Sequence, residues 1–170
     1  MKQEFKRQIV ELLDSHRIMT IATNRPDGWP QATIVGYAND GLLIYCFIGR
    51  KSQKFDNIAR DSRVSIAIGN DYPQPLQIKG LSLAAHVTAL DDEAEIDRAM
   101  ELLQQRYPEY AAMPRPAAAE VAVLRAVPEI VSILDYAKGF AHTDLVNVVD
   151  ADLPQHLDAQ QHRWLALQPA

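Results

Sequence analysis

Residues 18–48 read IMTIATNRPDGWPQATIVGYANDGLLIYCFI, and this stretch decides the fold of the chain. It contains three short runs of apolar and β-branched residues, a pattern typical of strands. Two clusters of turn-forming residues separate the runs, and such short connections join antiparallel neighbours, so the stretch predicts an antiparallel meander. The predicted strands cover residues 18–23, 31–37 and 42–48, and the turns are Pro26-Asp27-Gly28 and Asn39-Asp40-Gly41.

Helical patterns lie on both sides of this meander. Residues 3–16 carry apolar side chains at helical spacing and charged side chains between them, which predicts an amphipathic opening helix. Residues 49–61 predict a short helix with Ser52 as its N-cap. The acidic residues in 91–97 suit a helix N-terminus, and they predict a third helix whose apolar stripe ends at Tyr107.

Alternating apolar residues predict further strands in the second half of the chain. The parity of the apolar positions changes near Lys79-Gly80, which predicts a β-bulge at that point. Pro128 predicts a break between two final strands, because proline cannot donate to a ladder. These strands are expected at residues 64–68, 76–90, 120–127 and 129–138, and a tail helix is expected at 155–167.

The predicted elements define a mainly β fold with flanking helices. About seven strands, joined mostly as hairpins, favour a closed or nearly closed antiparallel barrel over a doubly wound parallel sheet. A chain of 170 residues fits one compact domain. We therefore expect residues 1–150 to form the barrel domain and residues 151–170 to form a C-terminal helical tail of the same domain.

Composition narrows the classes of function. The chain is 48% hydrophobic and carries a net charge of −5, whereas nucleic-acid-binding proteins are normally basic, so no nucleic-acid partner is expected. The longest apolar run, 42–48, is much shorter than the roughly 20 residues of a membrane span. Residues 1–10 alternate charged and apolar side chains, unlike a signal peptide, and the expected location is the cytoplasm.

A basic segment follows the third predicted strand. Arg50, Lys51 and Lys54 stand at the start of the predicted second helix, together with the hydroxyl of Ser52. Free backbone N–H groups, the helix dipole and cationic side chains would converge there, which is what a phosphate group requires. The alternative interpretation is an ordinary solvated basic segment, although basic residues are unfavourable at that end of a helix.

Other chemistries lack their motifs. The sequence contains no GxxxxGK[ST] or GxGxxG segment, which argues against a P-loop or dinucleotide-binding fold. Its five histidines show no HExxH or Cys/His spacing, so no metal site is expected, and no GxSxG elbow is present. Cys46, the single cysteine, lies in an apolar strand and is interpreted as a small buried hydrophobe.

Four segments in the same order resemble the pyridoxamine 5'-phosphate oxidase-like family of flavin-binding split barrels. The resemblance extends over roughly residues 5–138, and a later segment, 134–145, is similar to a subgroup signature. It implies a six-stranded split barrel within residues 1–150, a homodimer, and flavin mononucleotide (FMN) bound at the subunit interface. The four segments are 19–23, 27–33, 43–54 and 63–66.

The resemblance also implies cofactor-binding residues. Gly36 makes independent sense, because a residue without Cβ permits close approach of a flat ligand, although a packing glycine would look the same. The segment that grips the phosphate corresponds to Ser52, Gln53 and Lys54, preceded on the strand by Phe47 and Ile48 and supplemented by Arg50 and Lys51. The strand that lines the flavin ring corresponds to Thr33, Ile34, Val35, Gly36 and Tyr37.

The chain departs from the pyridoxamine oxidases proper at several positions. Those enzymes carry basic residues at the places of Thr33, Ala38 and Gln53, and they end in an arginine-leucine-x-proline motif that is absent here. The loss of positive charge argues against pyridoxamine phosphate as the substrate. Arg50 and Lys51 replace part of the charge expected around the flavin phosphate.

The expected function is that of an FMN-dependent oxidoreductase. Hydride would move between the flavin and a small organic substrate or a nicotinamide nucleotide. No side chain is an evident general acid or base, and His142 and Tyr136 are the candidates. Two alternatives stay open: a deazaflavin-dependent reductase of the same fold, and a non-enzymatic flavin or haem carrier or sensor.

Overall fold

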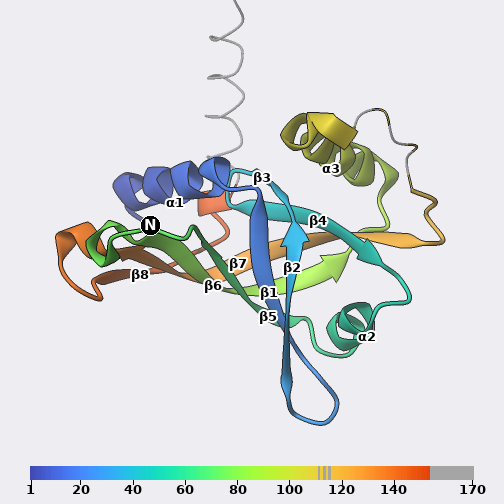
Figure 1. Ribbon diagram of the computed structural model, residues 1–170. Coiled ribbons are helices and arrows are strands. Elements are labelled where there is room, and N and C mark those ends of the chain that lie inside the picture. The colour runs from blue at the N-terminus through green and yellow to red at the C-terminus, as the bar shows by residue number, and fades with distance from the viewer. Residues whose placement is uncertain (111, 113, 115, 154–170) are drawn as a thin grey trace, which may run out of the picture.

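The computed structural model of the chain describes residues 1–110, 112, 114 and 116–153. In this part of the chain, eight antiparallel strands form one curved sheet in the order β2-β1-β5-β6-β7-β4-β3, with β8 beside β7 (Figure 1). The strands are β1 (Ile18–Asn24), β2 (Pro30–Gly36), β3 (Ala38–Asp40), β4 (Leu43–Gly49), β5 (Arg63–Gly69), β6 (Lys79–Ala89), β7 (Val121–Asp135) and β8 (Thr143–Asn147). The helices are α1 (Gln3–Ser15), α2 (Gln53–Arg60) and α3 (Glu93–Arg106).

Alternation along the strands builds the core. Ile21 lies opposite Ile66, and Ile66 lies opposite Leu83, so one buried row crosses β1, β5 and β6. The residues between them in sequence face the other side of the sheet, as the period of two requires. The sheet is therefore apolar on its concave side, where the main core lies.

The barrel is split between β2 and β4. These strands lie near one another, but they form no hydrogen-bonded ladder, and β2 is the first strand of the sheet order. The predicted meander is therefore wrong at its second step: β4 pairs with β7 and with the short β3, which contains Asn39 and Asp40 of the predicted turn. A single residue, Tyr37, joins β2 to β3, and it is fully buried. The predicted antiparallel split barrel is confirmed, with eight strands in the described residues where six or seven were expected.

Helix α1 packs Ile9 and Leu13 into the main core. The amino group of Met1 forms an ion pair with Asp152 at 2.8 Å, and the Lys6 ammonium donates to the Asp152 carbonyl oxygen. Burial lowers the pKa of Lys6, and the negative charge of Asp152 opposes this effect. These contacts hold the beginning of α1 against the segment that follows β8.

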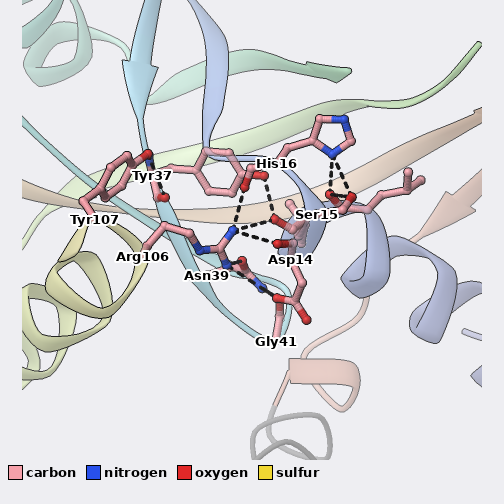
Figure 2. Close-up of polar contacts among 10 residues, drawn as sticks. Asp14, Ser15, His16, Tyr37, Asn39, Gly41, Arg106 and Tyr107 are labelled. Carbon is pink, nitrogen blue, oxygen red and sulfur yellow. Dashed lines mark hydrogen bonds and ion pairs between the residues drawn. The ribbon is translucent and has the colours of Figure 1, made fainter. Parts of the chain in front are cut away.

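Arg106, at the end of α3, holds the other end of α1. Its Nη1 lies 3.0 Å from the carbonyl oxygen of Leu13 and 2.6 Å from that of His16, and its Nη2 donates to Asn39 Oδ1 at 2.7 Å (Figure 2). A cation is favourable at a helix C-terminus, where carbonyl groups are left without intrahelical partners. One guanidinium group thus joins α1, β3 and α3.

Helix α3 covers a second, smaller apolar cluster, which includes Leu103 and Val123. At its start, the Asp92 side chain accepts a hydrogen bond from the Glu95 N–H at 2.8 Å, which confirms the capping interpretation of the acidic segment. Glu95 then accepts from Arg125 Nη1 at 2.9 Å and from the Tyr45 hydroxyl at 3.1 Å. The Ser52 N-cap of α2 is confirmed as well.

The predicted β-bulge at Lys79-Gly80 is wrong. Strand β6 begins at Lys79, and the preceding apolar residues belong to a 3₁₀ turn, so no shift of parity occurs within the strand. The register changes instead where Ala84 pairs with Ile130 and Ala85 with Pro128, which leaves Glu129 as the extra residue. The bulge therefore lies in β7.

Two other expectations fail in the same region. Strand β7 continues from Val121 to Asp135 through Pro128, because the bulge beside the proline absorbs the missing donor. Strand β8, at Thr143–Asn147, was not predicted, since it alternates only weakly in burial. The predicted tail helix, 155–167, lies outside the described residues.

We expect Arg106→Met to lower the free energy of unfolding by about 2–3 kcal/mol, because hydrogen bonds to a charged group contribute about 1.5–3 kcal/mol each. Urea denaturation followed by circular dichroism measures the change. Arg7→Met, on the exposed face of α1, removes the same charge and should stay within about 0.5 kcal/mol of the wild type. Equal stability of the two variants would contradict the role of Arg106.

Candidate functional site

The start of α2 is an ordered turn. The Ser52 hydroxyl donates to the Gly49 carbonyl oxygen at 2.7 Å and accepts from the Phe55 N–H at 3.4 Å. Ser52 is therefore engaged as a cap, and the remaining N–H groups of the first helical turn, at Gln53 and Lys54, have no partner within the helix. The turn presents backbone donors beside a cationic segment, which is a favourable arrangement for an anion.

The basic residues of this segment point in different directions. Arg50 Nε donates to the Ala118 carbonyl oxygen at 2.7 Å, and the guanidinium group lies 5.6 Å from the centre of the Phe55 ring. Lys51 and Gln53 are exposed. Arg50 thus stabilises the loop before β7, while Lys51 and Gln53 face solvent.

Lys54 is the half-buried cation of the segment. Its positive charge opposes the effect of burial on the pKa of the Cys46 thiol on β4. Burial raises the pKa of Cys46 to about 12, and Lys54 lowers it only in part. No ion pair to Lys54 is found in the described residues, so its charge is available to a ligand.

Strand β2 supplies the other side of the split. Gln31, Thr33 and Val35 alternate towards the interior, and the buried Oγ1 of Thr33 has no hydrogen-bond partner among the described residues. Gln31 Oε1 accepts from Asn57 Nδ2 at 3.1 Å, and the same amide nitrogen lies 3.0 Å from Thr23 Oγ1. Asn57 therefore fixes α2 against β1 and β2.

Lys54 and Asn57 are three residues apart in α2, so they share one face of the helix. Asn57 bonds to Gln31 on β2, the strand whose interior side also carries Thr33. Helix α2 and strand β2 thus contribute a cation, two amide side chains and a hydroxyl group without a partner among the described residues. Such a set of donors suits an anionic or strongly polar ligand.

The space beside Gly36 is filled by the chain itself. A Cβ atom at this position would lie 2.7 Å from the Tyr107 hydroxyl oxygen. That hydroxyl accepts from the Tyr37 N–H at 2.9 Å and donates to the Arg17 carbonyl oxygen. The absence of a side chain at Gly36 therefore accommodates Tyr107, which the sequence alone did not indicate.

The remaining predicted residues differ in orientation. Val35 packs against the main core and Ile48 belongs to it. Ile34 and Phe47 point to the outside of the sheet, with exposed fractions of 69% and 42%. Thr33 and Lys54 are thus partly buried, while the side chains of Ile34 and Phe47 lie on the outer face of the sheet.

The candidate acid–base residues lie elsewhere. His142 Nε2 is 3.3 Å from Asp144 Oδ2, and the Tyr136 ring lies 5.9 Å from that of Phe140, all on the connection from β7 to β8. This connection and α2 stand at opposite ends of the molecule (Figure 1). Among the described residues, no group of three or more His, Cys, Asp or Glu side chains is placed to hold a metal ion.

Sequence reasoning missed Gln31 and Asn57. A signal was present for Asn57, a polar residue that follows Lys54 by one helical turn and immediately precedes the buried Ile58. Its contacts with Thr23 and Gln31 connect residues 34 and 26 positions apart, which no local pattern predicts.

The fold and the polar split place the chain among the split-barrel proteins. The family described as pyridoxamine 5'-phosphate oxidase matches residues 5–134, which is most of the chain, and the chain belongs to this family. General stress protein 26 of Bacillus subtilis (strain 168) is 29% identical over 70 residues. That alignment covers 41% of this chain and 49% of the relative, so the chain spans about half the length of the curated protein it matches.

Solved structures show the same fold. A conserved hypothetical protein from Mycobacterium tuberculosis has a TM-score of 0.67 at 25% identity, covering 86% of this chain and 93% of that one. A haem-binding protein from Mycobacterium smegmatis has a TM-score of 0.67 at 20% identity. That match covers 84% of this chain but 56% of the mycobacterial chain, so this chain spans little more than half of that protein.

We expect the Cys46 thiol to be unreactive in the folded chain. Its raised pKa, about 12 against an ordinary 9.0, leaves far less thiolate near pH 8 than a free cysteine has. Labelling with a chromogenic disulfide reagent at pH 8 should be at least about a hundredfold slower in buffer than in urea. Fast labelling of the folded protein would show that the thiol and the neighbouring split are open to solvent.

Proposed function

We propose that this protein binds FMN at the split and acts as an oxidoreductase of the pyridoxamine 5'-phosphate oxidase-like family. One observation carries the proposal: Lys54, without an ion-pair partner in the described chain, stands in the first turn of α2, and Asn57 bonds this helix to Gln31 of β2, the strand that holds the unpartnered Thr33 hydroxyl. A phosphate needs cationic and hydroxyl donors of this kind. FMN, once bound, would supply the hydride chemistry.

The chain's own residues would bind and orient the cofactor. Lys54 and the first N–H groups of α2 would bind the phosphate, with Arg50, Lys51, Ser52 and Gln53 around them. The edge of β2 at Thr33, Ile34 and Val35 would receive the flavin ring, with Phe47 and Ile48 on the strand before α2, whereas the space beside Gly36 is occupied by Tyr107. Asn57 would keep α2 at a fixed distance from β2. In a variant of this proposal, the bound cofactor is a deazaflavin, which has a similar ring.

Haem is the second candidate ligand. It is favoured by the similarity to the Mycobacterium smegmatis structure, whose printed description is a haem-binding protein. The side chains around the split, Gln31, Thr33, Lys54 and Asn57, are amide, hydroxyl and ammonium groups, which suit a phosphate better than an iron centre. FMN therefore remains the first proposal. If this chain bound haem instead, it would be a carrier or sensor without turnover.

The proposal includes a homodimer with the flavin at the subunit interface. The family is generally dimeric. The convex face of the sheet also exposes large apolar side chains that a second subunit would cover, including Ile18, Ile34 and Leu145. A small organic molecule or a nicotinamide nucleotide would be the redox partner. In the described chain, no helix has the length and apolar character that crossing a membrane demands.

We expect about one FMN per chain, measured by titration calorimetry and by the visible spectrum of the purified protein. Lys54→Ala should weaken FMN binding roughly ten- to a hundredfold, because a charge-assisted hydrogen bond contributes about 1.5–3 kcal/mol. Lys2→Ala removes the same charge from an exposed position and is the matched control.

An affinity for FMN that is unchanged within about twofold in Lys54→Ala would show that the phosphate binds elsewhere. A colourless protein with no calorimetric response to FMN would contradict the proposed function. A Soret band on addition of haem, in place of flavin binding, would favour the carrier.

The protein should not oxidise pyridoxamine 5'-phosphate efficiently. A second phosphate needs its own cations, and the candidates between Phe55 and the tail are Lys79, Arg106, Arg115, Arg125 and Lys138. Arg115 lies outside the described residues, and the other four are in ion pairs: Lys79 with Asp135, Arg106 with Asp14, Arg125 with Glu95 and Lys138 with Asp144. Formation of pyridoxal 5'-phosphate by the FMN-loaded protein measures this activity. A kcat/KM at or above about 10⁴ M⁻¹s⁻¹ would contradict the prediction.

A further inference from the structure

The convex face of the sheet carries a hollow that the proposed cofactor site does not use. Its volume is about 280 Å³, and it lies where the β1–β2 hairpin leaves the sheet. Three small side chains on adjacent strands form its floor, because Ala22 lies opposite Ser65 and Ser65 lies opposite Ala84. The hollow is thus a direct result of small residues in register.

Longer side chains form the rim. Arg63 and His86 are a cross-strand pair on one side, while Asn24 and Pro30 are paired at the hairpin end. Glu129 stands on the β7 side, where the bulge exposes it, and its Oε1 lies 3.4 Å from His86 Nε2. The rim therefore combines the exposed Glu129 carboxylate, which faces His86, with polar side chains that are bonded to other residues.

The partners of the rim indicate what the hollow would accept. Arg63 donates to Asp61 Oδ1 at 2.9 Å and to Asp61 Oδ2 at 2.8 Å, and His86 Nδ1 lies 2.8 Å from the Ser62 hydroxyl. Since the guanidinium group is engaged by a carboxylate, the hollow offers little to an anion. A neutral ring with one N–H donor matches a floor of two alanines and one serine and the Glu129 carboxylate.

The size of the hollow points to one side chain. Pockets for small molecules and cofactors usually measure about 300–1,000 Å³, and this hollow, at about 280 Å³, is below that range. An indole ring is a neutral group of suitable size that buries a large apolar area and needs one acceptor for its N–H.

An exposed indole stands next to the hollow in the sequence. Trp29 lies at the tip of the β1–β2 hairpin, which extends beyond the rest of the sheet, and it is 72% exposed (Figure 1). Its backbone N–H donates to Asp27 Oδ1 at 3.2 Å, and its carbonyl oxygen accepts from the Arg25 N–H at 3.1 Å. The hairpin thus presents an ordered tryptophan to solvent, at little further cost in backbone entropy on binding.

We propose that Trp29 enters this hollow on a second copy of the chain, and that the partner's Trp29 enters the hollow of the first. The inference rests on the homodimer of the proposed function and names the contact that forms it. Pro30 lines the hollow and directly follows Trp29, so the indole ring and the hollow are adjacent in each chain. A two-fold axis beside the hairpin lets Trp29 of each subunit reach the hollow of the other subunit, so that both subunits use the same surface, as an isologous interface requires.

The same face provides the area around this exchange. A second transverse row contains the small residues Thr20, Ala67 and Ser82, each opposite the next. It continues to Ile34 at one end and Leu145 at the other, which are 69% and 73% exposed. Small side chains let two sheets approach closely, and the two large ones add apolar area to the interface.

The dissociation constant of the dimer tests the proposal, measured by sedimentation velocity over a dilution series. Trp29→Ala should raise it at least about thirtyfold, since a central tryptophan is typical of an interface hot spot. Tyr110→Ala, which removes another exposed aromatic ring in the 3₁₀ turn that follows α3, should leave it unchanged within about twofold. Equal dissociation constants for Trp29→Ala and the wild type would overturn the proposal.

A second variant fills the hollow instead of removing the ring. Ala84→Leu adds volume to the floor of the hollow, on the exposed face of β6. It should raise the dissociation constant of the dimer, as Trp29→Ala does, without loss of folding. If Trp29 occupies the hollow, the effects of Trp29→Ala and Ala84→Leu will not add in the double variant. Strict additivity would show that the two positions act independently and would overturn the proposal.

Fluorescence reports the environment of the ring directly. The chain has two tryptophans, Trp29 and Trp164, so in a Trp164→Phe background the emission comes from Trp29 alone. It should shift to the blue as the concentration rises through the dimer dissociation constant. A dimer with solvent-like Trp29 emission would overturn this inference and leave the FMN proposal intact, whereas a chain that stays monomeric would overturn it together with the interface.

Discussion

Strand β2 has a hydrogen-bonded neighbour on one side only, and the features of the candidate site follow from that fact. β1 pairs along its whole length, whereas its other edge faces β4 across the split. A bare edge needs cover, because its unpaired groups invite pairing with other chains. Helix α2 is tied to the β1–β2 hairpin through Asn57, whose amide reaches both Gln31 and Thr23. The position of Lys54 on this helix therefore depends on the same two bonds.

Side chains also replace a ladder at the end of β2. Tyr107 reaches the space beside Gly36 and bonds to the backbone of Tyr37, while the neighbouring Arg106 bonds to the last carbonyl groups of α1. Both residues come from the end of α3, so this helix determines how β2 continues into β3. The site residues on β2 are thus held from two directions, by α2 on one side and by α3 on the other.

Sequence patterns predicted the features that depend on neighbouring residues, such as turns and helix caps. The β1–β2 hairpin, the Ser52 cap and the acidic start of α3 depend on residues that are close in sequence, and all three are present. The predicted meander failed at its second step, because β4 pairs with β7, whose residues are distant in sequence, and not with β2. The bulge was misplaced because Glu129 is determined by the pairing of β6 with β7. Arg106 and Leu13 are 93 residues apart, so their contact follows only from the packed fold. In the site, the motif around Lys54 was visible, but its orientation towards the split was not.

Tyr37 has a consequence for how a ligand reaches the split. It is the single residue between β2 and β3, and its hydroxyl donates to the Leu13 carbonyl oxygen at 2.8 Å while its backbone bonds to Tyr107. A connection of one residue has no slack, so the two strands cannot separate without breaking these bonds. The barrel therefore does not open by hinge motion at this junction. In the proposed function, access to the split would therefore depend on the side chains that border it and not on separation of β2 from β3.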